Sequence, residues 1–388
     1  MLDKNDLLID LLRADDNDLC PCLSGKKYKD CHKIIVTREK EHPAKIALEI
    51  LKTKNKKRCL FGKGFDCGGE IIKAHSISQK HLEYIKDKTN HVYSFIPCLN
   101  LSNIEKIYES DYYQDPQKIG INDVTTFYGL CAKHDIELFR SFEVNPFSAS
   151  IEQIKAMHLR ALLKEIYVKE EAILTTDKTQ KYLGKIDNAS NVLSKNLNNA
   201  ILQLGNNLAL RDLLSEFSLI RNSMHNEDNE FKYVSFRIVG ECPVACSSIP
   251  NPAFDLYGNI IQNYNDENEF TRSFAINIFP ESNNAYFIVL SWFESIEISK
   301  FLKSLVERSK DRLLQYLIQL VFAFSENIAI SIKWFDSLSL IKRERLKKIF
   351  WKDIKSQDSG QYTHNEYRGH KFVNGQIISI NSNTSIFT

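Results

Sequence analysis

The 388-residue chain lacks the long apolar runs of a membrane protein and the high positive charge of a protein that coats nucleic acid. No apolar run approaches the roughly 20 residues that span a bilayer. The formal net charge is only +2, so binding to a polyanion needs a local basic patch. The opening stretch MLDKNDLLIDLLRADD lacks the basic start and continuous apolar core of a signal peptide. We therefore expect a cytoplasmic protein that does not contact a membrane.

Several catalytic motifs and a disulfide framework are also missing. The patterns GxxxxGK[ST] and GxSxG and the dinucleotide-binding fingerprint do not occur, which argues against nucleotide hydrolysis and esterase chemistry. Cysteines number nine, an odd total, and several stand at C-x-C and C-x2-H spacing. This usage is typical of metal thiolates in a reducing compartment rather than of disulfides.

A first metal-type cluster lies in CPCLSGKKYKDCH, with Cys20, Cys22, Cys31 and His32 as candidate zinc ligands. A segment this short cannot form a sufficient hydrophobic core, so it needs a cross-link to fold, and a zinc ion supplies one. The stretch resembles the SEC-C zinc motif of the bacterial secretion motor and of many other bacterial proteins, except that Leu23 stands where the family usually has glycine. The resemblance implies a structural zinc, and often a role in binding protein or nucleic acid. The alternative is a knuckle that only stabilises the fold.

A second cluster combines two distant segments. Its candidate zinc ligands are Cys59, Cys67, Cys131 and His134. Glycines around the first two permit a tight knuckle, and a strand, EIIKAHSIS, follows. Cys131 and His134 stand three residues apart at the start of a predicted helix, so both can reach one metal.

This treble-clef pattern resembles the zinc-bearing branch of HNH endonucleases. The resemblance implies that His75 is the general base and that Asp135 binds a catalytic Mg²⁺ or Mn²⁺, separate from the structural zinc. The chain departs from the family in having Ala74 before His75, a long insert, and Asn122 far upstream of Cys131 as the nearest orienting asparagine. The alternatives to a general-base role are that His75 is a zinc ligand or a buried, hydrogen-bonded histidine.

A basic run without acidic residues precedes and enters the second cluster. It comprises Lys52, Lys54, Lys56, Lys57, Arg58 and Lys63. With the lysines of the first cluster, it would form a positive face for the phosphates of DNA or RNA. The alternative is a solvated linker. The Tyr- and Asn-rich insert at 80–124 either stacks bases or forms an ordinary β-rich core.

The rest of the chain shows two kinds of periodicity. Helical spacing predicts two long helices at 150–182 and about 188–228, an antiparallel pair. Period-two spacing over 231–293 predicts an antiparallel sheet, with a hairpin turn at 280–284 and buried thiols at Cys242 and Cys246. One further helix is expected over 297–328 and another after it, capped at Asp336 or Ser337. The tail after Ser356 forms a late hairpin or is loosely held.

The predicted fold is α+β, with a two-zinc N-terminal head, a long helical connection, and an antiparallel sheet with C-terminal helices. The expected units are 1–45, 46–147, 148–230 and 231–388. Two functions follow. The first is a zinc-dependent bacterial protein that binds nucleic acid or a protein partner. A role in phage defence is suggested because SEC-C and HNH-like modules often occur in such proteins. The second is a divergent HNH-type metal-dependent endonuclease.

Overall fold

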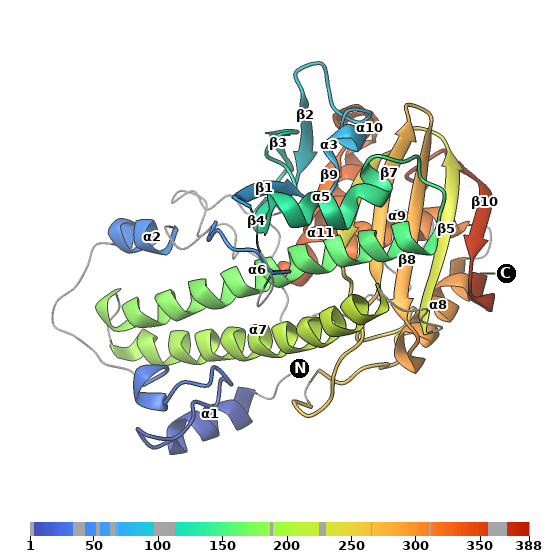
Figure 1. Ribbon diagram of the computed structural model, residues 1–388. Helices are drawn as coiled ribbons and strands as arrows, with labels where there is room; N and C mark the ends of the chain where they lie inside the picture. The colour runs from blue at the N-terminus through green and yellow to red at the C-terminus, as the bar shows by residue number, and fades with distance from the viewer. Residues whose placement is uncertain are drawn as a thin grey trace.

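The main sheet of the computed structural model is antiparallel and eight-stranded, and it stands in the right-hand half of the molecule in Figure 1. The model describes residues 4–33, 43–51, 55–62, 67, 69–96, 113–186, 189–224, 230–264, 266–309, 312–355 and 371–387. The strands run in the order β10-β5-β8-β7-β6-β9-β2-β3. Their bounds are β2 His91–Ser94, β3 Gln117–Gly120, β5 Phe231–Val239, β6 Val244–Ser248, β7 Ala275–Ser282, β8 Ala285–Phe293, β9 Ile328–Ile330 and β10 Gln376–Ser382.

Both faces of the central strands are buried. Along β8, Tyr286, Ile288, Leu290 and Trp292 pack into one core with C-terminal helices, while Phe287 and Val289 pack into a second core beneath the long helices. The β7–β8 hairpin confirms the predicted sheet and its turn. The second face of the sheet is apolar because helix α6 contacts β6, β7 and β8 and covers it.

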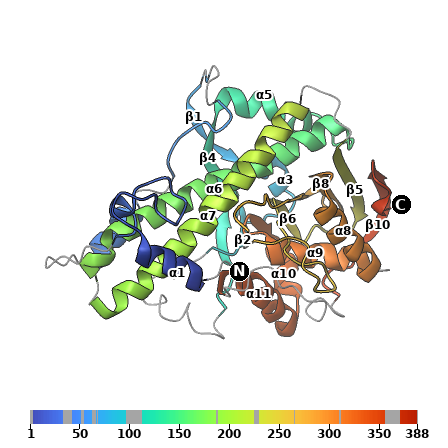
Figure 2. The same cartoon turned by 90° about the horizontal axis from the view of Figure 1, so that it is seen from below.

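Two long helices pack along one another and confirm the predicted pair. They are α6 Ile151–Ile186 and α7 Ala189–Ser223. Figure 2 shows the pair crossing the molecule on the side of the sheet opposite to α9 and α11. One end of the pair covers the sheet, and the other end extends away from it toward residues 4–33, the N-terminal unit.

The C-terminal helices differ from the prediction. A single helix over 297–328 is wrong, because the region holds α8 Ile296–Ser309, α9 Leu313–Phe324 and strand β9. The polar stretch SKDR at 309–312 interrupts the apolar period, and the three residues of β9 are buried between β6 and β2. The following helix is also two: α10 Ile332–Ser337 and α11 Leu340–Lys355. The side chain of Ser331 caps α10, so Asp336 and Ser337 end a helix rather than begin one.

Strands from the N-terminal part join the C-terminal sheet. β2 and β3 come from the insert at 80–124 and extend the sheet beyond β9, as an ordinary β-rich core does. The segment expected at 46–147 therefore contributes to the sheet expected at 231–388. At the opposite edge, β10 pairs with β5 instead of forming a late hairpin in the tail.

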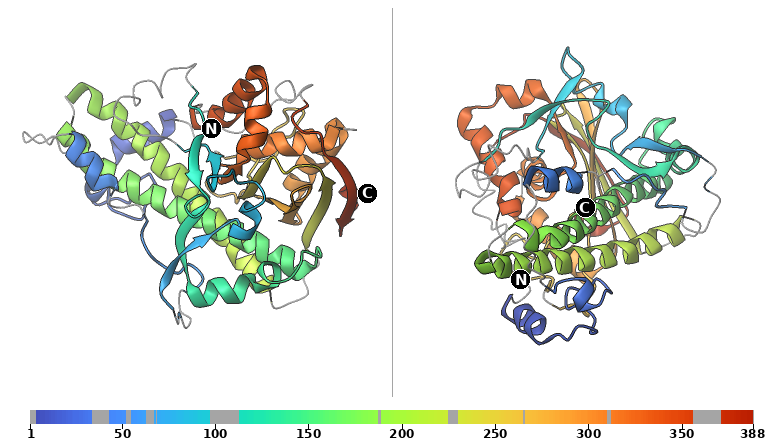
Figure 3. Two further views of the ribbon diagram at one scale, coloured as in Figure 1. Left: turned by 90° about the horizontal axis from the view of Figure 1, so that it is seen from above. Right: turned by 90° about the vertical axis from the view of Figure 1, so that its left-hand side faces the viewer.

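Most of the remaining elements come from the N-terminal part of the chain, coloured blue to green in Figure 3. They are α1 Lys4–Arg13, η1 Tyr28–Asp30, α2 Pro43–Leu51, β1 Ile71–His75, α3 Gln79–Leu82, β4 Thr126–Cys131 and α5 Ala132–Glu143, with η3 Ser385–Phe387 near the C-terminus. β1 and β4 form a separate two-stranded antiparallel sheet. Among the described residues, none of the helices combines the length and apolar character needed to cross a membrane.

Candidate metal centres and the His75 site

The structure brings Cys20, Cys22, Cys31 and His32 together, with one ligand atom of each within 4.8 Å of all the others. Nδ1 of His32 lies 3.3 Å from the sulfurs of Cys20 and Cys31, and the sulfurs of Cys22 and Cys31 are 3.6 Å apart. Tetrahedral zinc with ordinary bond lengths requires about 3.5 Å between nitrogen and sulfur and about 3.8 Å between sulfurs. The donor set therefore fits one zinc ion.

The thiols of the first cluster lie close enough together to change one another's pKa values. Hydrogen bonds with Cys22 and Cys31, together with burial, raise the pKa of Cys20, and the reciprocal hydrogen bonds lower the pKa of Cys22 to about 3. A bound dication would hold all three sulfurs as thiolates.

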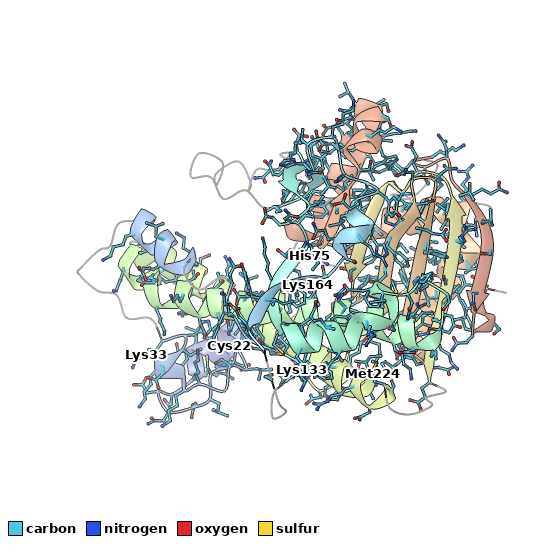
Figure 4. All side chains as sticks on the ribbon, turned by 45° about the horizontal axis from the view of Figure 1, so that its top comes forward. Cys22, Lys33, His75, Lys133, Lys164 and Met224 are labelled. Carbon is cyan, nitrogen blue, oxygen red and sulfur yellow. The ribbon has the colours of Figure 1, made fainter. Side chains whose placement is uncertain are left out.

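The first cluster is docked on helix α7. Asn207 donates to the carbonyl of Cys22 at 2.9 Å, and Asn196 donates to the carbonyl of His32 at 3.1 Å. An apolar cluster joins Leu7 and Leu11 of α1 to Ala200 and Leu204 of α7. Figure 4 shows Cys22 and Lys33 in this N-terminal unit, apart from His75.

The second quartet also converges. Nδ1 of His134 lies 3.2 Å from the sulfur of Cys59, 3.3 Å from that of Cys131 and 3.9 Å from that of Cys67. Cys131 ends β4 and His134 lies in the first turn of α5, so one strand–helix junction supplies two donors. Gly62 makes room for a third, since a Cβ built on it would fall 1.8 Å from the sulfur of Cys67. This donor set likewise fits one zinc ion.

His75 ends β1 as predicted, and its half-buried ring has a defined tautomer. Its Nε2 lies 3.1 Å from the carbonyl oxygen of Ile121. Because a carbonyl only accepts, Nε2 carries the proton and Nδ1 carries the lone pair. Burial, opposed by this hydrogen bond, lowers the pKa of His75, so its ring is neutral near pH 7. The ring is bonded to the carbonyl of Ile121 and, among the described residues, not to the side chain of Asn122, whose amide oxygen accepts from Gln79 at 2.8 Å.

Asp135 lies close enough to His75 for each charge to affect the other's pKa, but it contacts an arginine. Nη2 of Arg160 lies 3.3 Å from Asp135 and 2.7 Å from Glu143. Burial raises the pKa of Asp135, and the arginine opposes this. Among the described residues, the two Cys/His quartets are the groups of three or more metal-type side chains, and Asp135 belongs to neither.

Only part of the basic run lies within the described residues. Lys52, Lys54 and Lys63 fall outside them, whereas Lys56 and Lys57 are exposed. Arg58 is paired with Glu170 at 2.6 Å and with Glu171 at 3.2 Å, both on α6. In the first cluster, Lys26 pairs with Asp177 and Lys33 with Asp16. Acidic partners therefore interrupt the continuous positive face that the sequence suggested.

The first cluster has a counterpart among known families. Residues 17–33 match the SEC-C motif. The match spans all four donors of the first cluster, and it supports a metal-binding unit there. No curated protein and no solved structure matches the chain.

Two important residues were missed by sequence reasoning. Arg160 is only 2% exposed and holds two carboxylates of the His75 site. An arginine within the apolar period MHLRALL was a usable signal, because a buried charge requires partners. Gly62 stood out only as one of several glycines in a loop, and its contact with Cys67 appears only in three dimensions.

Proposed function

We propose that this chain is a zinc-stabilised nucleic-acid-binding protein that hydrolyses phosphodiester bonds at the β1–β4–α5 unit, in the manner of a divergent HNH endonuclease. The observation that carries the proposal is the hydrogen bond from Nε2 of His75 to Ile121, which puts the lone pair on Nδ1, an atom that makes no hydrogen bond within the described part of the chain. This lone pair can accept a proton from a substrate water. A general base for use near pH 7 must be neutral there, and the lowered pKa of His75 provides this.

The roles of the chain's own residues follow from this arrangement. Nδ1 of His75 takes a proton from the attacking water, while the Ile121 carbonyl holds the ring in place. Asp135 is the residue that would hold Mg²⁺ or Mn²⁺, and such a cation would stabilise the charge that develops on the leaving oxygen. Arg160 orients Asp135 through Oδ1. The two quartets hold the zinc ions that fix the surrounding fold.

The test is cleavage of plasmid, single-stranded DNA and RNA, each with Mg²⁺ or Mn²⁺. We expect His75→Ala to abolish cleavage while the protein keeps two zinc ions per chain and a similar melting temperature. His91→Ala is the matched control, because Nδ1 of the His91 ring bonds with Thr89 in its own turn. If wild-type protein cuts none of the substrates, or if His75→Ala still cuts, the catalytic proposal is wrong.

Nucleic-acid binding is tested separately from cleavage. The ammonium groups of exposed Lys56 and Lys57 have no acidic partner among the described residues, although the backbone N–H of Lys56 donates to Glu171. Lys56→Glu/Lys57→Glu should therefore weaken association with DNA or RNA. Wild-type affinity should fall steeply as salt rises from ~50 to ~200 mM if several phosphates are contacted. An unchanged affinity in the double variant would contradict this route of binding.

A second candidate function is binding of a protein partner without catalysis. The observation in its favour is a set of exposed leucines in the N-terminal unit: Leu12 is 70%, Leu19 is 72% and Leu23 is 45% exposed. Serine at all three positions should remove a partner that wild-type protein and His75→Ala both retain during affinity purification. A partner kept by the triple variant would reject this surface.

A further inference from the structure

A small cavity lies where helix α6 meets the sheet, between the two cores. Its lining includes Arg160 from α6, Ser247 from β6 and Asn277 from β7. Ser247 and Asn277 face each other across the β6–β7 ladder. All three are at least 96% buried, with exposed fractions of 2%, 3% and 4%.

These side chains present hydrogen-bond donors without partners. Nε and Nη1 of Arg160, Nδ2 of Asn277 and Oγ of Ser247 are buried and make no hydrogen bond within the described residues. Leaving a buried donor without a hydrogen bond destabilises the folded state, and more so when the donor is charged. Four such atoms on three residues that line one cavity therefore favour a ligand that accepts hydrogen bonds.

The size and chemistry of the cavity narrow the class of ligand. Its volume of about 20 Å³ is little more than the ~10–15 Å³ that one water needs, so a whole phosphate group or nucleotide does not fit. The guanidinium of Arg160 contributes positive charge, which Asp135 and Glu143 partly offset from outside the lining, and no carboxylate lines the described part of the cavity. The two carboxylates that contact Arg160 do so through Nη2, and Nε and Nη1 make no hydrogen bond within the described residues. Three of the four unpartnered atoms are nitrogen donors, which cannot accept the hydrogens of a water, whereas the hydroxyl of Ser247 can both donate and accept.

We propose that this cavity binds a monatomic anion, chloride, between Arg160, Ser247 and Asn277. Chloride accepts from every unpartnered donor and needs no acceptor in return. By holding Nε and Nη1, the anion also fixes the guanidinium whose Nη2 positions Asp135 and Glu143. The site is independent of whether the chain cleaves nucleic acid.

The experiment compares anions at equal ionic strength. We expect wild-type protein to be more stable in sodium chloride or bromide than in sodium gluconate. The unfolding equilibrium constant should fall roughly tenfold when chloride exceeds its dissociation constant tenfold. Crystals grown in bromide should show an anomalous peak within hydrogen-bonding reach of Arg160 and Asn277. No peak, or equal stability in all anions, overturns the proposal in favour of a trapped water.

A pair of neighbouring serines makes the matched variants. Ser247→Ala removes a lining donor and should reduce the stability difference between chloride and gluconate. Ser248→Ala, equally buried but not among the lining residues, should leave that difference intact. Asn277→Leu, which keeps a similar shape, is a second lining variant should Ser247→Ala fold poorly. Equal responses in the lining and control variants would place the anion effect elsewhere on the protein.

Discussion

Replacing Gly62 by alanine is the sharpest test of the second metal centre. A Cβ at this position would lie 1.8 Å from the sulfur of Cys67 and 3.2 Å from Cε1 of His134. Carbon and sulfur that are not bonded need roughly twice the first distance, so the thiol must move by more than ~1 Å. Metal sites tolerate deviations in ligand distance of about 0.2 Å. Gly62→Ala should therefore remove Cys67 from the ligand set.

The expected result is a fall from two zinc ions per chain to about one, measured by elemental analysis of dialysed protein. With cobalt in place of zinc, the charge-transfer absorption should lose the contribution of one thiolate. A structural zinc in small peptides contributes ~10–16 kcal/mol, so losing a ligand should lower the melting temperature clearly. The loss should match that of Cys67→Ala, and combining the two changes should add little, because both remove the same contact.

Gly205 provides the control. It lies inside α7, and a Cβ built on it meets nothing within 4 Å. Gly205→Ala should stabilise the protein by about 0.5–1 kcal/mol through helix propensity and leave the zinc content at two. If Gly62→Ala keeps both zinc ions and an unchanged cobalt spectrum, the assignment of Cys67 to the site is wrong.

Three further predictions concern docking and pH. Arg58→Met should lower the free energy of unfolding by about 1–3 kcal/mol, because it removes the half-buried ion pairs of Arg58 with Glu170 and Glu171, whereas exposed Lys57→Met should change it by less than ~0.5 kcal/mol in urea titrations. Asn207→Ala should cost about 1–2 kcal/mol by removing the hydrogen bond to Cys22, with Asn206→Ala nearly neutral and zinc content unchanged in both. Burial lowers the pKa of His81 from 6.5 to about 3, so the neutral ring contributes stability above pH 6.5 that is lost as the pH falls toward 3. His81→Gln should reduce the change in free energy of unfolding with pH by the contribution of one proton, about 1.4 kcal/mol per pH unit. An identical pH dependence in both proteins would contradict the lowered pKa.

Local patterns in the sequence were enough to identify several elements. The period of 3.6 predicted α6 and α7, because long helices depend on contacts only three or four residues apart. The period of two predicted the β7–β8 hairpin in the same way. The C-x-C spacing grouped Cys20, Cys22, Cys31 and His32, since donors close in sequence can reach one metal with little dependence on the rest of the fold. In the second quartet the same reason covers Cys131 and His134, whereas Cys59 and Cys67 join them through the tertiary structure.

Only the tertiary structure decided how distant segments combine. The insert strands β2 and β3 reach the C-terminal sheet through β9, a pairing set by complementary edges and not by any local signal. The acidic partners of Arg58 come from α6, more than 100 residues away in sequence, so the apparent basic face could not be judged from the run of lysines alone. Arg160 joins α5 to α6 and faces the β6–β7 pair for the same reason: burial of a charge is settled by which elements pack together, and that packing depends on the shape of the whole core.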